Sequence, residues 1–206
     1  SLTLRRPLRI RRVASRRYAI DGTPTDSVLL GIRKVMKATP PDIVLAGINR
    51  GGNLGEDITY SGTVAAAMEG ALLGLPSVAF SQYYSDRQRV SWETAEAWTY
   101  KVLETLFALK WPTGVLMNVN FPNVSPDKVC GIEVVRQGRR KIGGALTEGI
   151  DPRGDPYYWV GPQREENVLR AGTDLKVVAA GGISITPLSL DLTHQSMLRT
   201  MKALLE

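Results

Sequence analysis

The residues best suited to chemistry lie in one continuous segment, residues 47–63, which reads GINRGGNLGEDITYSGT. Asn49 follows a short apolar run directly, and its amide oxygen is a neutral but suitable ligand for a hard cation such as Mg²⁺. If Ser61, Gly62 and Thr63 begin a helix, their hydroxyls, free N–H groups and helix dipole form an anion site. This combination suits a metal-bound phosphate. The alternative interpretation is a turn asparagine followed by an ordinary helix cap.

Several other kinds of site are disfavoured. His194 is the only histidine and lies far along the chain from the glycine-rich loop, so a surface or capping role is expected rather than a serine–histidine hydrolase. Cys130 is the only cysteine, and its apolar context predicts a buried, inert thiol. Without a cluster of cysteine and histidine, a zinc site of the usual kind is not expected. The common nucleotide-binding glycine motifs are also absent from the sequence.

The composition is that of an ordinary globular protein. The chain has 206 residues, of which 43% are hydrophobic and 22% charged, enough for a substantial core. No apolar run approaches the roughly 18 residues that a membrane span needs, so no membrane partner is expected. One cysteine cannot form an internal disulfide, which favours a reducing compartment and a cytoplasmic location.

The net charge of +6 comes from the first segment of the chain. Residues 1–17 contain no acidic residue and seven arginines: Arg5, Arg6, Arg9, Arg11, Arg12, Arg16 and Arg17. Without them, 19 basic residues remain against 20 acidic ones, a net charge of −1. Nucleic-acid binding through this segment is therefore an alternative function. An exposed strand-loop segment is favoured, because no aromatic residue precedes Tyr18 to stack on bases.

Short apolar runs alternate with helical patterns through residues 21–121. The apolar spacing predicts helices over 28–36, 62–74 and 93–109. Strands are predicted over 43–48, 77–80 and 115–121. This alternation is typical of βαβ units and predicts an α/β fold with a parallel sheet. Ligands bind beyond the carboxyl ends of such strands, where Asn49 lies.

The last third of the chain follows a different pattern. Strand-like pieces separated by polar and Gly/Pro turns are predicted over 132–135, 157–160, 176–179 and 183–186. With little helix to cover them, they either form an oligomer contact or pack on the chain's own sheet. A closing helix is predicted from Thr193, its N-cap, to Leu205. We therefore divide the chain into a core over 1–130 and a C-terminal β-hairpin arm with a final helix over 131–206.

Long motifs spread along the chain resemble one known family, that of the stationary-phase survival protein SurE. The motifs are DGTPTD (21–26), AGINRGGNLG (46–55), YSGTVAAAMEG (60–70), NVNFP (118–122), DPRG (151–154), YYW (157–159) and SITPL (184–188). The resemblance implies a Rossmann-like, three-layer α/β/α core with a mostly parallel sheet. It also implies a phosphatase dependent on Mg²⁺ or Mn²⁺ that acts on nucleoside 5′- and 3′-monophosphates and on short polyphosphate. Homodimers or homotetramers built partly by the C-terminal arms are implied as well.

The resemblance assigns site residues position by position. The asparagine of the family's metal ligands maps onto Asn49. The substrate pocket maps onto Asn53, Ser61, Gly62 and Thr63. The family's other metal ligands are paired aspartates in an Asn-Asp-Asp-Gly motif and a serine. These lie upstream of the position that matches Ser1, where we expect a cut or preceding segment, so no catalytic residue is assigned within the 206 residues.

A physical argument about charge agrees with this departure. One neutral amide cannot hold Mg²⁺ against water, because carboxylates must supply charge. The acidic residues of the matched regions are Asp21, Asp26, Glu56, Asp57 and Glu69. Their spacing pairs none of them with Asn49, so turn, cap and surface roles are favoured. Asp26 is the strongest of the five as a candidate metal ligand. We therefore expect little phosphatase activity from the 206 residues alone, and a non-catalytic nucleotide-binding module is the alternative.

Overall fold

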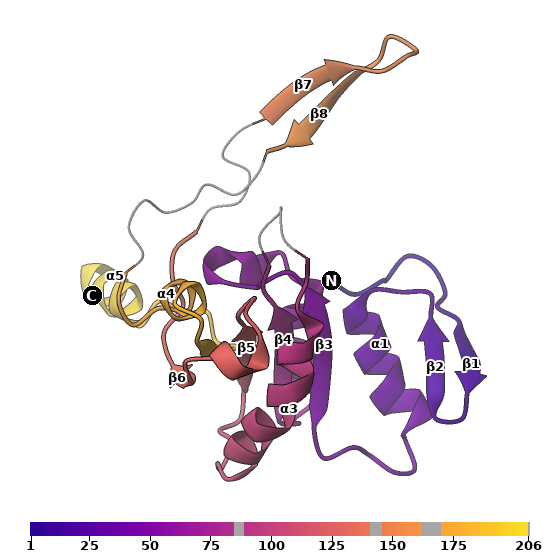
Figure 1. Cartoon of the computed structure of the whole chain (residues 1–206). Helices are drawn as coiled ribbons and strands as arrows, with labels where there is room; N and C mark the ends of the chain where they lie inside the picture. The colour runs from indigo at the N-terminus through magenta and orange to yellow at the C-terminus, as the bar shows by residue number, and fades with distance from the viewer. Residues whose placement is uncertain (85–88, 141–145, 162–169, 206) are drawn as a thin grey trace.

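The structure is a computed structural model that describes residues 1–84, 89–140, 146–161 and 170–205. Its centre is a five-stranded sheet with the strand order β3-β4-β5-β9-β6 (Figure 1). These strands are β3 (Val44–Arg50), β4 (Ser77–Gln82), β5 (Val115–Phe121), β9 (Ile183–Ser189) and β6 (Ile132–Val134). Strands β3, β4 and β5 run parallel, and β9, which is antiparallel to β5, pairs in parallel with β6.

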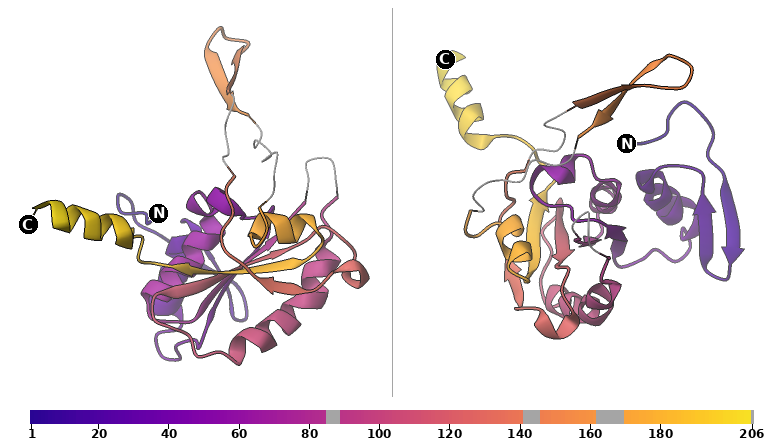
Figure 2. Two further views of the ribbon diagram at one scale, coloured as in Figure 1. Left: turned by 90° about the vertical axis from the view of Figure 1, so that its left-hand side faces the viewer. Right: turned by 45° about the horizontal axis from the view of Figure 1, so that its top comes forward.

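Helices cover both faces of this sheet (Figure 2). The helices are α1 (Pro24–Leu30), α2 (Gly62–Leu72), α3 (Trp92–Phe107), α4 (Asp174–Ala179) and α5 (Gln195–Leu205), of which the C-terminal α5 projects away from the sheet (Figure 2). Short helical turns are η1 (Gly31–Val35), η2 (Gly55–Thr59) and η3 (Pro126–Lys128). The predicted three-layer α/β/α core with a mostly parallel sheet is therefore confirmed.

Two apolar clusters hold the layers together, one on each face. Helix α3 packs on alternate residues of β4, β5 and β9, including Phe80 and Phe121, whose rings stack with their centroids 5.8 Å apart. Helix α2 packs on the opposite face and lies close to it. A Cβ at Gly70 would come within 2.7 Å of the Val44 side chain, so a larger residue at position 70 would push the helix off the sheet.

The first helix begins earlier than its apolar spacing predicts. Thr23 is its N-cap, and Pro24 opens its first turn. The Thr23 hydroxyl accepts a hydrogen bond from the Asp26 N–H, and the Asp26 carboxylate accepts one from the Thr23 N–H. This capping box draws what looks like a turn-rich segment into the helix.

The strand predicted over 176–179 is wrong, because these residues belong to α4. Asp174 stands in the first turn of the helix, while Leu175 and Val178, three residues apart, pack against Leu54. A short continuous apolar run does not distinguish a strand from a buried helix. The packing against Leu54 decides the outcome here.

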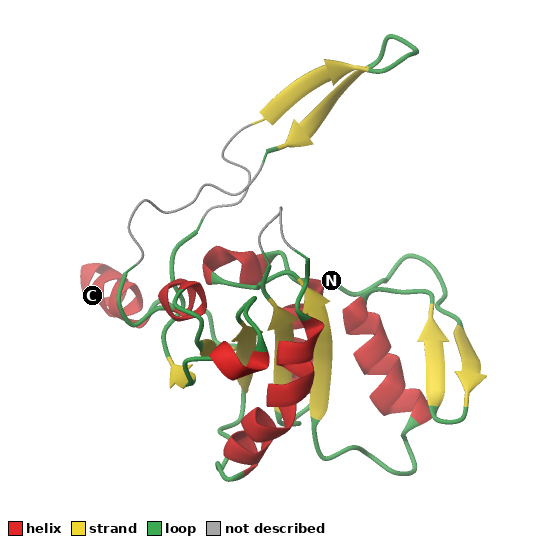
Figure 3. Ribbon diagram, viewed as in Figure 1, coloured by secondary structure: helices red, strands yellow, loops and turns green. Residues whose placement is uncertain are grey.

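The C-terminal part contributes both to the sheet and to an extended arm. Strands β6 and β9 and helix α4 join the main body, whereas β7 (Leu146–Ile150) and β8 (Pro156–Val160) form an antiparallel hairpin that projects from it (Figure 3). Every residue of its two strands except Gly149 is exposed. The division of the chain at residue 130 stays a prediction.

Two further predictions, for Cys130 and for Thr193, need correction. Cys130 is exposed rather than buried, since its sulfur lies beside the carbonyl oxygens of Lys128 and Ala180 at the surface. Helix α5 is capped by His194 rather than by Thr193, because His194 Nδ1 accepts a hydrogen bond from the Met197 N–H at 3.2 Å. The expected capping or surface role of His194 is confirmed.

The arginine-rich segment forms a separate two-stranded hairpin, β1 (Ile10–Ala14) and β2 (Arg17–Ile20), outside the main sheet. All seven of its arginines are exposed. No helix among the described residues has the length and apolar character needed to cross a membrane.

Candidate functional site

The pairing of β3 with β4 is irregular just before Asn49. The pairing of β3 with β4 is regular up to Ala46, is interrupted, and resumes with Asn49 opposite Ser81. Gly47 lies in the interruption with a φ of +123°, and a Cβ there would come within 2.5 Å of the Phe80 carbonyl oxygen. Only glycine fits this conformation and this close approach. Such irregularities re-aim side chains at the ends of strands.

The side chain of Asn49 is held from two sides. Its Nδ2 donates a hydrogen bond to the Gly51 carbonyl oxygen at 2.9 Å, and its Oδ1 accepts one from the Thr63 hydroxyl at 3.3 Å. The first contact fixes which end of the amide is the oxygen. The structure thereby brings together two residues, Asn49 and Thr63, that are 14 positions apart in the sequence.

Asn49 and Thr63 line an open hollow of about 520 Å³ between α1, β3 and the start of α2. The other residues that line it are Gly22, Pro24, Ser27, Val28, Ala46, Gly47, Ile48, Arg50 and Ala66. Of these described residues, Arg50 alone is charged, and its guanidinium lies 5.4 Å from the centre of the Tyr84 ring. A cation, a hydroxyl and an amide at one hollow can bind an anion such as phosphate.

Ser61 and Gly62 form the start of α2 at the border of this hollow. Ser61 is the N-cap, and its hydroxyl accepts a hydrogen bond from the Val64 N–H at 3.1 Å. Gly62 is exposed, and a Cβ there would lie 3.1 Å from the Pro24 ring. The N-terminus of this 11-residue helix therefore borders the hollow at Thr63, where its partial positive charge favours an anion.

Asn53 lies behind the hollow rather than in its lining. It is only 5% exposed, and its Nδ2 donates to the Ser81 hydroxyl at 2.6 Å. Its backbone is held by Asn118 and Asn120 of β5, whose part at the site the sequence analysis missed. The signal for them was a pair of amides, spaced two apart, in an otherwise apolar strand.

The acidic candidates have partners away from Asn49. Asp26 accepts hydrogen bonds from the N–H and hydroxyl of Thr3, and the hydroxyl contact is the main cause that lowers the pKa of its carboxyl. Asp21 accepts from the Arg9 N–H at 2.7 Å, which likewise lowers its pKa. Neither carboxylate is among the residues that line the hollow.

The remaining acids belong to α2 and to a charged cluster below the loop. Glu69 is 8% exposed within α2. Asp57 forms an ion pair with Arg140, and the Glu56 carboxylate accepts a hydrogen bond from the Arg140 N–H. The predictions of turn and cap roles hold for Asp21 and Asp26, whereas a surface role is wrong for Asp57, buried in this ion pair, and for Glu69, buried within α2.

The described residues do not complete a site for a divalent cation. Nowhere in the described part of the chain do three or more His, Cys, Asp or Glu side chains gather in a way that could hold a metal ion. Asn49 offers one neutral oxygen, and the nearby Thr63 hydroxyl is neutral too. Mg²⁺ binding needs carboxylate charge in addition.

A carboxylate anchors the far end of the same loop. Asp174 Oδ2 accepts a hydrogen bond from the Gly55 N–H at 2.9 Å, and its Oδ1 accepts one from the Gly138 N–H at 2.7 Å. Burial raises the pKa of the Asp174 carboxyl, because the charged form loses water. The loop over 49–55 is thus fixed by contacts at its beginning, middle and end.

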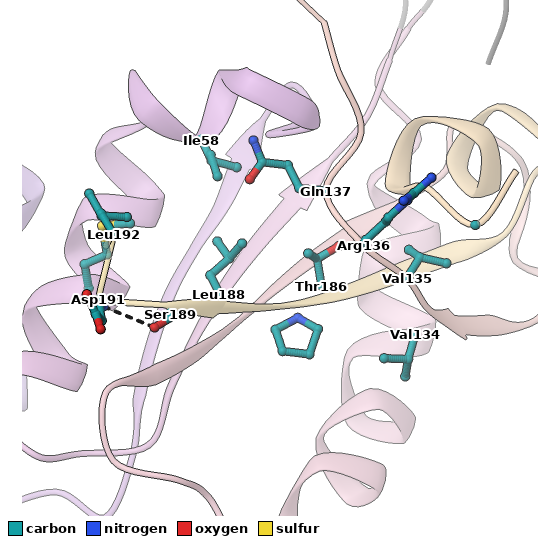
Figure 4. A pocket seen from close by; sticks show the side chains of 13 residues that line it. Ile58, Val134, Val135, Arg136, Gln137, Thr186, Leu188, Ser189, Asp191 and Leu192 are labelled. Atoms are coloured by element: carbon teal, nitrogen blue, oxygen red, sulfur yellow. Dashed lines mark hydrogen bonds between the residues drawn. The ribbon is translucent and has the colours of Figure 1, made fainter. Parts of the chain in front are cut away.

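A second hollow, of about 770 Å³, lies over β9 and β6 (Figure 4). Apolar side chains such as Ile58, Met68 and Leu188 line it together with Arg136 and Gln137. None of the predicted site residues is among the residues that line it. This groove is therefore separate from the candidate site at Asn49.

The chain is similar to known proteins along almost its whole length. A family profile described as "Survival protein SurE" matches residues 1–144. A "5'-nucleotidase SurE" of Paramagnetospirillum magneticum is 55% identical over 98% of this chain and 78% of that protein. One of Parvibaculum lavamentivorans is 50% identical over 99% of this chain and 74% of that protein. The crystal structure of the SurE protein from Aquifex aeolicus superimposes with a TM-score of 0.85 at 40% identity, covering 100% of this chain and 83% of that one.

Proposed function

The chain belongs to the SurE family, and from this premise we propose that it removes phosphate from nucleoside monophosphates. Relatives that are 50% and 55% identical over almost the whole chain are named 5'-nucleotidases, and the chain is an enzyme of that class. The observation that carries the proposal is the contact between Asn49 and Thr63 at the hollow beside the start of α2. Nucleoside 3′-monophosphates and short polyphosphate are proposed as further substrates from the family resemblance.

We assign the phosphate to the hollow that Asn49 and Thr63 line. In this proposal Thr63, Gly62 and the α2 N-terminus receive the phosphate oxygens, and Ser61 keeps the helix start in place through its cap. Donors that are fixed before the substrate arrives stabilise charge that develops in the transition state. Asn53 supports the pocket from behind, because its side chain is buried against Ser81.

We further propose that activity depends on a divalent cation, Mg²⁺ or Mn²⁺, with Asn49 as one ligand. Such a cation supplies charge stabilisation and an activated water when it is bound. The described residues around Asn49 do not fit such a cation on their own, because they supply no carboxylate cluster to hold its charge. This chain spans 78% and 74% of the two nucleotidase relatives, and we propose that the carboxylate ligands belong to the remainder of the family's sequence.

The exposed apolar surface of the C-terminal part supports assembly into a homodimer or homotetramer. Trp159 is 68% exposed on β8, and Leu204 and Leu205 of α5 are 79% and 86% exposed. Apolar patches of this kind usually mark protein contacts. We propose that copies of the chain associate through β7, β8 and α5.

A cytoplasmic location is proposed from the single cysteine.

The test is release of inorganic phosphate from AMP, with and without Mg²⁺, Mn²⁺ or a chelator. It is run on two proteins. One is the 206-residue chain, and the other is the same chain extended at its N-terminus with the residues that precede the aligned region in the 55% identical relative. The second is called the extended chain. Phosphate release from the extended chain that the chelator abolishes supports the proposal. Nucleotide binding without phosphate release from either chain supports the non-catalytic binding module instead.

A further inference from the structure

Strand β5 places two amide side chains in the middle of the protein. Asn118 and Asn120 are both 0% exposed, and they lie on the same face of the strand as Leu116. The opposite face carries Met117, Val119 and Phe121, which pack under α3. Burying an amide is unfavourable unless hydrogen bonds replace those lost to water. Each amide atom of the pair except Asn118 Oδ1 has a partner among the described residues, and these partners show what the pair holds.

Both amides bind the backbone of a single residue, Asn53. Asn120 spans it: its Oδ1 accepts from the Asn53 N–H at 2.8 Å, and its Nδ2 donates to the Asn53 carbonyl oxygen at 3.2 Å. Asn118 Nδ2 donates to the same carbonyl oxygen at 2.8 Å. The pair thus imitates a neighbouring strand and fixes the position of one peptide group on each side of Asn53.

The fixed backbone leads directly to Asn49. Gly52 alone separates Asn53 from Gly51, whose N–H donates to the Gln82 carbonyl at the end of β4. The Gly51 carbonyl oxygen accepts the hydrogen bond from Asn49 Nδ2 at 2.9 Å. A shift of the loop at Asn53 therefore moves the acceptor that fixes the Asn49 amide.

We propose that Asn118 and Asn120 are positioning residues for the phosphate site: by holding the backbone of Asn53 they fix the direction in which Asn49 presents its amide oxygen. The link to phosphate rests on the proposed function, whereas the link to Asn49 does not. Groups that orient a ligand residue typically change activity about 10- to 100-fold when they are removed.

The test uses two variants of the 206-residue chain, one expected to disturb the Asn53 backbone strongly and one expected to disturb it less. Asn120→Asp replaces the donor Nδ2 with an oxygen that repels the Asn53 carbonyl. Asn118→Ala removes one of the two donors to that carbonyl and introduces no charge. For each variant, NMR records the side-chain NH₂ signal of Asn49 and the exchange rate of the Asn53 amide hydrogen, and kinetics give kcat and KM for AMP in the extended chain.

The expected result is a moved Asn49 side-chain signal in both variants. Exchange of the Asn53 amide should rise about tenfold or more in Asn120→Asp, because its acceptor is disturbed. kcat/KM for AMP should fall about tenfold or more in that variant, since Asn49 is misaligned. If Asn120→Asp does not fold, Asn118→Ala decides the question alone.

Matched controls separate positioning from general destabilisation. Ser184 and Thr186 lie opposite Asn120 and Asn118 in β9 and are 0% and 2% exposed. Their hydroxyls have no hydrogen-bond partner among the described residues, so Ser184→Ala and Thr186→Val should leave the Asn49 signal unchanged. Val119→Ala, on the other face of β5, should lower the melting temperature and also leave this signal in place.

Two outcomes distinguish the inference from the proposed function. If the Asn49 signal in Asn118→Ala and Asn120→Asp is the same as in the wild type and in Val119→Ala, the positioning role is overturned. If the wild-type extended chain releases no phosphate from AMP, the proposed function fails, and the Asn49 signal still decides whether these amides orient the loop.

Discussion

The loop over residues 49–55 is held in two chemically different ways, at its middle by neutral amides and at its end by a buried carboxylate. Asn118 and Asn120 bind the backbone of Asn53 through three hydrogen bonds. Asp174 binds the Gly55 N–H, and it also accepts from the N–H groups of Gly138 and Leu175. The amide anchor does not titrate, whereas the carboxylate anchor is a titratable group whose pKa is raised by burial.

The two anchors therefore have different roles: the amides fix the local geometry of the loop, and the carboxylate joins distant segments of the chain. Neutral amides do not titrate, so the geometry that leads to Asn49 is independent of pH. The carboxylate joins three segments that are far apart in the sequence, because one charged group can accept several N–H donors. Its cost is desolvation, which raises the pKa of Asp174. Of the two anchors, the uncharged one at Asn53 is thus the one nearer to Asn49 in sequence.

The largest effect is expected from Asp174→Asn. An amide oxygen can replace one carboxylate oxygen, but the amide NH₂ would then face a backbone N–H such as that of Gly55 or Gly138. A buried donor left without its charged acceptor should lower the free energy of unfolding by about 3 kcal/mol. Urea unfolding measures it. An unchanged midpoint would mean that this anchor contributes no stability.

The Asn49→Ala variant is expected to show the reverse profile, with lost activity and retained stability. It removes the oxygen that faces the hollow and the contact to Gly51, and kcat/KM for AMP should fall about tenfold or more. The melting temperature should stay close to that of the wild type, because Asn49 is only partly buried. Thr59→Ala, at an exposed residue of η2, is the control. Unchanged turnover and metal dependence would contradict the assignment of Asn49.

The pH dependence of stability should have opposite signs for Asp174 and Asp26. Burial raises the pKa of Asp174 above its ordinary value of 3.8, so its contribution is present below 3.8 and is lost as the pH rises through the folded pKa. The hydrogen bond from the Thr3 hydroxyl lowers the pKa of Asp26, so its contribution is present above 3.8 and is lost as the pH falls through the folded pKa.

Unfolding free energies measured across this pH range, for the wild type and the single variants Asp174→Asn and Asp26→Asn, check these signs. The deficit of Asp174→Asn should shrink as the pH rises above 3.8, and that of Asp26→Asn should shrink as the pH falls below 3.8. Parallel curves for both variants would show that neither carboxylate is perturbed in the folded protein.

The sequence predicts the elements of this molecule better than it predicts their contacts. The short runs over 43–48 and 77–80 and the alternating segment 115–121 are predicted as strands, and the structure confirms all three as β3, β4 and β5. The segment 176–179 is too short for its period to be read, and its helix follows from packing on Leu54. The residue types over 47–63 and the family motifs both assign Asn49 and Thr63 to one site, and the structure shows the hydrogen bond between them.

The roles of Asn118 and Asn120 could not be predicted from local pattern. In sequence they alternate with apolar residues, which is typical of a strand with one face in water. Their burial depends on the loop over 49–55 folding back across the sheet, 65 and 67 positions away.

The smallest effect is expected at Thr186, which lies beside Asn118 in the sheet but forms no hydrogen bond with its hydroxyl among the described residues. The Thr186 hydroxyl is buried without a hydrogen-bond partner among the described residues, directly opposite Asn118 in β9. Thr186→Val keeps the shape of the side chain and removes an unsatisfied polar atom, so the free energy of unfolding should rise by about 0.5 kcal/mol. Thermal unfolding measures it. A clear loss of stability would show that this hydroxyl does bind a partner, and the polar residues of this face would then act as one network, without a distinct anchor at Asn53.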